Sequence, residues 1–164
     1  MNYMKFHKVE PRLNNYDYRT HKYAIYVYLD PFVVWDKKVA FECCGKKQKF
    51  HFYYLPIYVG KLESPIVYRQ NHHLHFFRRG IKDVQNQYKE EYLREIERKM
   101  EEERESLTPD PLMPKSWDDY KKGWIIILKT FSDKESLREF EKKLIQAIGV
   151  RRDNSGPLVN IVKG

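Results

Sequence analysis

Three short apolar segments along the chain have the composition of β-strands. Residues 23–29 are dense in β-branched and aromatic side chains, and the Asp30-Pro31 pair ends them. Residues 56–60 hold a short β-prone run that ends in glycine. Residues 124–128 are continuously apolar, as expected of a strand that is covered on both faces. The pattern therefore predicts three strands that lie far apart in the sequence.

The segment between the first two strands predicts an inserted β-hairpin. Residues 32–55 alternate short β-prone pieces around the basic stretch 43–47, Cys-Cys-Gly-Lys-Lys, which has the composition of a turn. The first twenty residues mix aromatic, basic and turn-forming types without a period, so we expect residues 1–20 to form an N-terminal arm. No linker or internal repeat divides residues 21–164, which we assign to one domain.

Helical periodicity predicts two successive helices in the middle of the chain. Ser64-Pro65 has the composition of a helix start, and Arg78-Arg79 followed by Gly80 has that of a helix end. A second helix follows, with apolar residues three or four positions apart up to Met100. Its far end, Glu101–Glu105, is almost entirely charged, and we interpret it as a solvated, protruding helix rather than a functional acidic tail.

The C-terminal third of the chain predicts a loop, then the third strand, then a last helix. Residues 108–123 contain three prolines and are expected to form a loop. Ser132 and Glu135 have the spacing of a capping box for the last helix, which Gly149 ends. The order of elements indicates a small mixed α/β domain of the α+β kind, built around a short sheet with an inserted hairpin and a long charged helix.

Composition and charge narrow the class of protein. The chain has 164 residues, of which 41% are hydrophobic, so it can bury a core and is not disordered. It lacks an apolar run of the roughly 18 residues that span a bilayer, and its start lacks the apolar segment of a signal peptide. Two adjacent cysteines, Cys43 and Cys44, form neither a disulfide framework nor a zinc spacing, which suits a reducing cytoplasm. The 31 Lys and Arg against 23 Asp and Glu give a net charge of +8, which favours a polyanionic partner such as nucleic acid.

Two polar residues stand at positions where the pattern expects apolar ones. In the last helix Glu141 falls inside the apolar stripe of Leu137 and Ile145. A carboxylate there must pair with a basic side chain, bind a cation, take up a proton or lie at the edge of the stripe. Asn160 similarly interrupts an apolar run near the C-terminus, either as a site residue or as a buried amide that satisfies a turn.

The first predicted helix also carries a cluster of basic and histidine side chains. His72 and His75 share a side of the helix but lack the four-residue spacing of zinc ligands, and His73 points elsewhere. A phosphate-facing or proton-transferring role suits the cluster better than zinc, and ordinary core or surface histidines remain an alternative.

Three short motifs, far apart along the chain, form an ordered set. Ala24-Ile25-Tyr26 is followed by Tyr58-Val59-Gly60, and then by Glu141 on the last helix and the segment Gly156-Pro157-Leu158-Val159-Asn160. The first two stand where the GIY-YIG nuclease family has Gly-Ile-Tyr and Tyr-Ile-Gly. The last resembles the closing pattern of its bacteriophage homing-endonuclease-like branch, a helical glutamate followed by Gly-Pro-Leu-x-Asn. The resemblance covers residues 23–162.

The resemblance implies a three-stranded antiparallel sheet with flanking helices and metal-dependent hydrolysis of phosphodiester bonds. By position, Tyr26 and Tyr58 would line the active surface, where one of them positions or deprotonates the attacking water. Glu141 would be the single metal-binding carboxylate, for Mg²⁺ or Mn²⁺, and would face the sheet surface that carries both tyrosines.

Other positions follow from the same resemblance. Arg69 matches the catalytic arginine of the family by its spacing and by the Arg-x-x-x-His pattern that ends at His73. Asn160 matches the asparagine that supports the site, and Lys61 and His73 are expected as further participants. Leu62 departs from the glycine that this branch commonly has after Gly-Lys.

The chemistry of the reaction fits these residue types. A carboxylate-held Mg²⁺ supplies Lewis acidity, and an arginine offers paired donors to the phosphate. A tyrosine needs nearby cations to act as a base, because its ordinary pKa is near 10.

These observations predict a DNA endonuclease of the GIY-YIG type that nicks or cuts double-stranded DNA in the cytoplasm of a bacterial or phage-infected cell. DNA contacts are expected at the basic turn and at the end of the first helix, although the same charges also suit an ordinary solubilising surface: Lys46, Lys47, Lys49, Arg78 and Arg79. The alternative is a nucleic-acid-binding module that keeps the scaffold without turnover. The target sequence, the oligomeric state and the biological role, such as homing, are left open.

Overall fold

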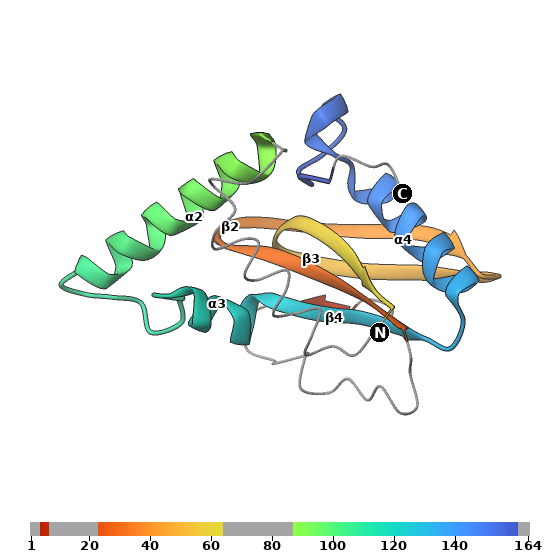
Figure 1. The fold of residues 1–164 in the computed structure, drawn as a ribbon, viewed down its shortest axis with the longest axis horizontal. Coiled ribbons are helices and arrows are strands. Elements are labelled where there is room, and N and C mark those ends of the chain that lie inside the picture. Colours follow the sequence, from red (N-terminus) through yellow and green to blue (C-terminus); the bar gives the residue numbers. More distant parts are fainter. Residues whose placement is uncertain (1–3, 7–22, 64–86, 161–164) are drawn as a thin grey trace.

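A four-stranded sheet forms the centre of the computed structural model, which describes residues 4–6, 23–63 and 87–160. Three strands are antiparallel: β2 (Tyr23–Cys43) lies between β3 (Lys46–Leu62) and β4 (Ile125–Phe131). The short strand β1 (Met4–Phe6) pairs parallel to β3 and completes the order β1-β3-β2-β4 (Figure 1). The α+β class with a three-stranded antiparallel sheet is thereby confirmed, and the expected N-terminal arm contributes a strand to that sheet.

The hairpin is part of the two long strands rather than an insertion between shorter ones. β2 and β3 pair over most of their length and meet at a tight turn, in which Cys44 has φ 57° and Gly45 has φ 74°. Two positive φ values at the central positions are the geometry of a type I′ turn, whose twist matches that of the flanking strands. Register shifts along the hairpin absorb the irregular stretch that contains Pro31 and Asp36.

Three helices accompany the sheet in the described part of the chain: α2 (Gln87–Glu105), α3 (Trp117–Trp124) and α4 (Lys134–Ile148). The expected loop at residues 108–123 is therefore only partly correct, because its second half is helical. Ser116 caps α3 by accepting a hydrogen bond from the Asp119 backbone N–H, and the three prolines all precede this cap. The first predicted helix lies outside the described residues.

The ends of α4 differ slightly from the expected ones. Its N-cap is Asp133, whose carboxylate accepts from the backbone N–H of Ser136 at 2.7 Å, so the predicted capping box at Ser132 is wrong by one residue. Its C-terminal end is confirmed at Gly149, which has φ 94°. A Cβ there would lie 2.3 Å from the carbonyl oxygen of Ser155, so both the backbone conformation and the close packing require glycine.

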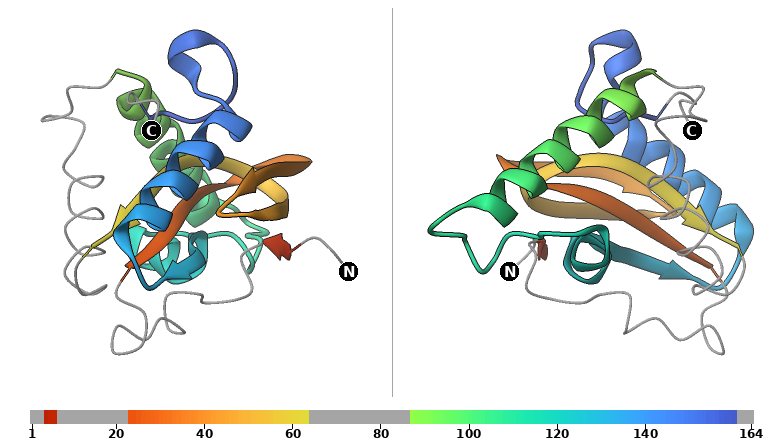
Figure 2. Two further views of the ribbon diagram at one scale, coloured as in Figure 1. Left: turned by 90° about the vertical axis from the view of Figure 1, so that its right-hand side faces the viewer. Right: turned by 60° about the vertical axis from the view of Figure 1, so that its left-hand side comes forward.

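Helices α3 and α4 cover opposite faces of the sheet. The buried ring of Phe140 on α4 packs against the ring of Phe131, which pairs with Tyr23 in the sheet. Tyr120 on α3 instead packs against Tyr28. Because side chains alternate along a strand, Tyr23 and Tyr28 point to opposite faces. Figure 2 shows the two helices on either side of the strands.

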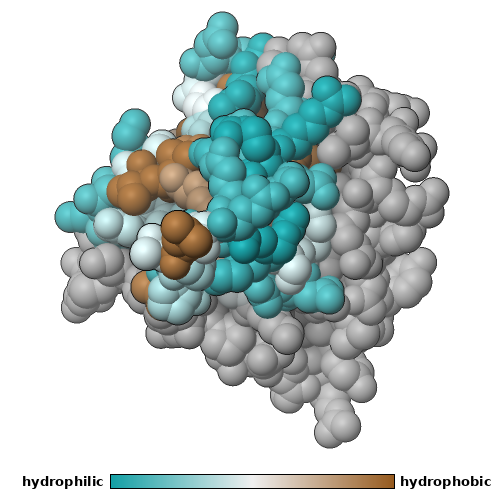
Figure 3. Space-filling model, turned by 90° about the vertical axis from the view of Figure 1, so that its left-hand side faces the viewer, coloured by the Kyte–Doolittle hydropathy of each residue, from teal (hydrophilic) through white to brown (hydrophobic). Residues whose placement is uncertain are grey.

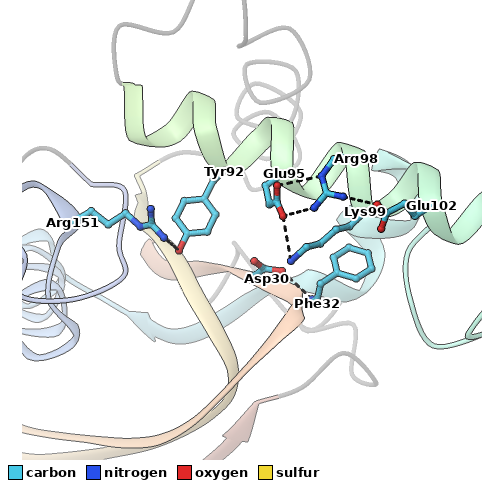
Figure 4. A network of polar contacts seen from close by, with 8 residues as sticks. All are labelled: Asp30, Phe32, Tyr92, Glu95, Arg98, Lys99, Glu102 and Arg151. Atoms are coloured by element: carbon cyan, nitrogen blue, oxygen red, sulfur yellow. Dashed lines mark hydrogen bonds and ion pairs between the residues drawn. The ribbon is translucent and has the colours of Figure 1, made fainter.

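Polar contacts fasten α2 to the middle of β2 and to the segment that follows α4. The buried carboxylate of Asp30 accepts from the backbone N–H of Phe32 at 2.9 Å and lies beneath α2 (Figure 4). Arg151, just beyond α4, donates to the hydroxyl of Tyr92 at 2.7 Å and stacks on the same ring, with its guanidinium carbon 4.2 Å from the ring centroid. The Lys99 ammonium also lies 5.9 Å from the centroid of the Phe32 ring, so two cation–π contacts and charged neighbours hold the helix.

The C-terminal end of α2, beyond the buried Met100, faces solvent. Its side chains from Glu101 to Glu105 are exposed or nearly so, which confirms the predicted solvated helix end. The surface on this side of the molecule is mainly hydrophilic, with small hydrophobic areas between the polar ones (Figure 3). Within the described residues, the large apolar side chains that are well exposed are Val34, Leu107 and Leu112. Helix α2 is also too polar to cross a membrane, and the same holds for every helix in the described part of the chain.

Candidate functional site

The inward-facing glutamate of α4 meets a lysine at the end of β3. The carboxylate of Glu141 accepts a hydrogen bond from the Lys61 ammonium at 3.2 Å. The Glu141 side chain is only 14% exposed, whereas that of Lys61 is 36% exposed. The prediction that Glu141 lies on the core-facing stripe is thereby confirmed, and its neighbour is another of the predicted site residues.

The surroundings of Glu141 act on its pKa in opposing directions. Burial raises the pKa of this carboxyl above its ordinary value, the Lys61 ammonium lowers it, and the nearby Glu63 carboxylate raises it. Burial is the largest of the three effects, so Glu141 holds its proton more tightly than an exposed glutamate. Burial disfavours the ionised form of Glu141, so a cation bound beside the carboxylate would stabilise that form.

Glu63, which the sequence pattern did not single out, lies near the same ion pair. It follows Lys61 by two positions, the spacing that returns a side chain to the same side of an extended chain. Its carboxylate lies 4.0 Å from the Lys134 ammonium and 3.8 Å from Nε of Arg138, both on α4. The end of β3 and one side of α4 therefore share a cluster of alternating charges around Glu141.

The predicted tyrosines form a group of their own. The rings of Tyr26 and Tyr58 lie 6.3 Å apart between centroids, and Tyr28 contacts both at 5.7 and 5.8 Å. The Tyr26 ring also covers Gly60, its partner in the β2–β3 pairing. Burial, followed by the neighbouring Tyr58, raises the pKa of Tyr28 well above its ordinary value of 10.0, so this phenol stays protonated at neutral pH.

The register separates the tyrosine group from Lys61. Tyr26 pairs with Gly60 and its ring covers that residue, whereas Lys61 pairs with Ile25. Consecutive pairs in a sheet point to opposite faces, so Lys61 and its partner Glu141 lie on the α4 face and the tyrosine rings lie on the other. The expectation that Glu141 faces the sheet surface that carries both tyrosines is therefore wrong. The backbone of β3 at Gly60 and Lys61 therefore separates the two groups.

Asn160 supports this same part of β3. Its side-chain oxygen accepts from the backbone N–H of Val59 at 3.0 Å, and its amide nitrogen donates to the carbonyl of the same residue at 2.8 Å. A backbone hydrogen bond from the Val159 N–H to the Ile57 carbonyl, at 2.8 Å, joins the same two segments. The buried amide thus takes the place of a neighbouring strand at the edge of the sheet and holds the residue before Gly60.

The basic turn at the hairpin tip is largely exposed. Lys46 and Lys47 face solvent and Lys49 is half-buried. Glu42 stands opposite Lys47 in the register, so part of the positive charge is balanced locally. The other predicted site and DNA-contacting residues lie outside the described residues: Arg69, His73, Arg78 and Arg79.

The charged cluster on the α4 face contains carboxylate oxygens and basic side chains side by side. Mg²⁺ and Mn²⁺ prefer carboxylate oxygens, and the charge of Glu63 acts on that of Glu141. The Lys61 ammonium lies beside Glu141 in the present arrangement and would have to share the Glu141 carboxylate with the metal. Glu63 likewise faces Lys134 and Arg138, so both carboxylates already have basic neighbours, and pairing with a basic side chain is one of the alternatives left open for Glu141 by the sequence.

Comparisons with models of protein families, with curated proteins and with solved structures found no match. The functional argument therefore rests on the chemistry and placement of this chain's own residues.

Proposed function

We propose that this chain is a metal-dependent DNA endonuclease of the GIY-YIG, homing-endonuclease-like type. The observation that carries the proposal is the inward-facing Glu141 carboxylate, which lies on a core-facing helix stripe beside a lysine and a second carboxylate. Keeping a carboxylate at such a position costs stability unless it has a charged partner, and a site for a cation is one reason to keep it.

Each residue of the cluster has a role in this proposal. Glu141 and Glu63 would hold a Mg²⁺ or Mn²⁺ ion, which when bound supplies Lewis acidity toward a phosphate oxygen. Lys61 keeps Glu141 ionised and places a positive charge where the phosphodiester would lie. Tyr58 and Tyr26 lie on the other side of β3, so neither phenol has a direct role at this cluster, and the Tyr26 ring covers the neighbouring Gly60.

Positive charge elsewhere on the chain supports a nucleic-acid partner. The net charge of +8 and the exposed Lys46 and Lys47 at the hairpin tip suit contacts to a phosphate backbone. Such contacts weaken steeply as salt rises, because binding releases condensed counterions. The compartment in this proposal is the cytoplasm of a bacterial or phage-infected cell, where double-stranded DNA is present.

One observation favours a second function, a nucleic-acid-binding module without turnover. Lys61 already neutralises Glu141, and the tyrosine rings lie on the opposite face of the sheet. With Glu141 paired to Lys61 and the tyrosines on the other face, these residues can stabilise the fold beneath a DNA-binding surface without taking part in hydrolysis. The two functions share the DNA partner and differ only in hydrolysis.

Incubation with supercoiled plasmid separates the two functions. The parent chain, Glu141→Gln and the matched control Glu135→Gln are compared with Mg²⁺ and with a chelator. Glu135 is exposed on the same helix, so its variant removes an equal charge away from the cluster. Far-UV circular dichroism of the three proteins establishes that each is folded.

The endonuclease proposal expects nicking by the parent and by Glu135→Gln, only with metal, and a loss of at least about 100-fold in Glu141→Gln. Nicking that is unchanged in Glu141→Gln would contradict the assignment of that residue. Retardation of DNA in a gel without nicking by any of the three would instead support the binding module.

A further inference from the structure

A second cluster of metal-binding side chains lies at the tip of the hairpin, away from Glu141 and Glu63. The thiols of Cys43 and Cys44 lie 3.0 Å apart, and one ligand atom from each of Cys43, Cys44 and Glu139 falls within 4.8 Å of the others. Cys43 is buried and Cys44 is exposed, so the cluster lies at the surface and remains open to an ion from solvent.

Three elements of the fold hold these side chains together. The tight turn that begins at Cys44 brings the end of β2 against the N-terminal half of α4. There the Glu139 carboxylate accepts a hydrogen bond from the Cys44 backbone N–H at 3.0 Å. The Cys44 thiol in turn lies 3.9 Å from the carbonyl oxygen of Ser136, one helical turn before Glu139. The contact joins residues that are 95 positions apart, which is why cysteine spacing in the sequence gave no sign of it.

The two thiols are better suited to binding a metal than to forming a disulfide. Adjacent Cα atoms across a trans peptide are about 3.8 Å apart, shorter than the usual separation of at least about 4.4 Å in disulfides. A tetrahedral zinc ion with bonds of about 2.3 Å needs its sulfur ligands about 3.8 Å apart, so the two thiols, now 3.0 Å apart, would separate slightly as the ion binds.

We propose that Cys43, Cys44 and Glu139 form a binding site for a thiophilic divalent cation of the zinc class. Two sulfurs and one carboxylate oxygen match the mixed ligand sets of such ions, and they do not match Mg²⁺, which prefers oxygen alone. Both thiols lose their protons to solvent as the ion binds, so the two thiolates and the carboxylate together outweigh its charge. Three protein ligands leave a fourth position for water, as in zinc sites with an open position.

Binding at this site would tie the hairpin tip to α4. The ion would bridge the end of β2 and a helix residue two positions before Glu141, and Lys46 opposite Cys43 would be held with it. The site is independent of the endonuclease proposal, because it uses other residues and another class of metal.

Metal titration of the reduced, purified chain tests the site without DNA. Zn²⁺ is titrated by calorimetry and Co²⁺ by visible and near-ultraviolet absorption, in the parent chain and in Cys44→Ser, Glu139→Gln and the control Glu135→Gln. Cobalt reports its ligands, because thiolate coordination gives charge-transfer bands that coordination by histidine or carboxylate alone does not give. Circular dichroism checks that each variant is folded before metal is added.

We expect one ion per chain, charge-transfer bands with Co²⁺, and affinities that fall by at least about tenfold in Cys44→Ser and Glu139→Gln while Glu135→Gln stays like the parent. Absence of the charge-transfer bands in the parent would overturn the proposal. So would an unchanged affinity in either folded ligand variant. A plasmid assay without nicking would leave this result untouched, so the two proposals fail separately.

Discussion

The phenol ring of Tyr26 lies directly over Gly60, the residue opposite it in the β2–β3 pairing. A Cβ built at Gly60 would stand 2.2 Å from Cζ of Tyr26 and 2.3 Å from its hydroxyl oxygen, far inside van der Waals contact. The tyrosine is 3% exposed and its ring also contacts Tyr28 and Tyr58, so it has little room to retreat. Glycine is required at this position by the neighbouring side chain rather than by the backbone angles.

Substituting Gly60→Ala is expected to destabilise the protein by about 1–3 kcal/mol, because the added methyl group overpacks the tyrosine group. Urea unfolding followed by circular dichroism measures the change. In a Tyr26→Ala background the same substitution should cost much less, since the obstructing ring is gone. An equal cost in both backgrounds would show that the ring contact is not the cause.

Removing the amide of Asn160 is expected to cost about 1–3 kcal/mol. Asn160→Ala leaves the backbone N–H and C=O of Val59 without their side-chain partners at a buried edge of the sheet. The exposed amide of Gln146 on α4 provides a control, and Gln146→Ala should change the unfolding free energy by less than about 0.5 kcal/mol. Hydrogen exchange should localise the loss, with faster exchange at Val59. Exchange there at the parent rate would count against the edge-capping role.

The buried carboxyl of Asp30 predicts a specific dependence of stability on pH. Burial, more than any other effect, raises its pKa above the ordinary 3.8, although a backbone N–H bond and the neighbouring Lys99 partly oppose this. The folded state then binds the proton more tightly than the unfolded state does. Asp30 therefore contributes stability at low pH, and this contribution is lost as the pH rises from the unfolded pKa through the folded one.

Asp30→Asn should remove this part of the pH dependence, since an amide does not titrate and its oxygen can still accept from Phe32. The difference in unfolding free energy, variant minus parent, should grow more positive as the pH rises from about 4 toward neutral. Urea unfolding at a series of pH values gives this difference directly. A difference that shrinks over that range would mean that the charges of Lys99 and Arg151 outweigh burial.

Much of the fold follows from local pattern. The run of β-branched and aromatic residues at 23–29 and the apolar run from Trp124 predicted strands of the observed sheet. Helix α3 was missed because three prolines lie in the preceding segment. Ser116 and Asp119 nevertheless have the spacing of a helix cap, which is a sequence signal for this helix. The N-cap of α4 is also a local feature, because Asp133 accepts from the backbone N–H of Ser136 three residues later.

The candidate site was predictable only in part, because strand register decides which side chains share a face of the sheet. An ionisable residue on an apolar stripe is visible in the sequence, and this identified Glu141 correctly as inward-facing. Which face of the sheet it meets depends on register, because a shift of one residue moves every side chain to the other face. Lys61 pairs with Ile25, so Lys61 and Glu141 lie on the face of the sheet that does not carry the tyrosines. No local sequence pattern contains that information.

The ion pair between Lys61 and Glu141 predicts how catalysis responds to acid, if the endonuclease proposal holds. Glu141 must be ionised to hold a metal ion, and burial has already raised its pKa. The Lys61 ammonium lowers that pKa, so Lys61→Met should raise it further and leave more of the carboxyl protonated at mildly acidic pH. The acid side of the nicking-rate profile should therefore move to higher pH in this variant.

Plasmid nicking rates at several pH values and saturating Mg²⁺ provide the measurement, with the exposed Lys142→Met as a control of equal charge change on α4. A merely general loss of phosphate affinity would lower the rate by one factor at every pH and leave the shape of the profile unchanged. A profile that keeps its midpoint in Lys61→Met would therefore mean that Lys61 acts on the DNA and not on the ionisation of Glu141. A shifted midpoint, absent in Lys142→Met, would identify the lysine as the residue that keeps this buried carboxylate ready for a metal ion.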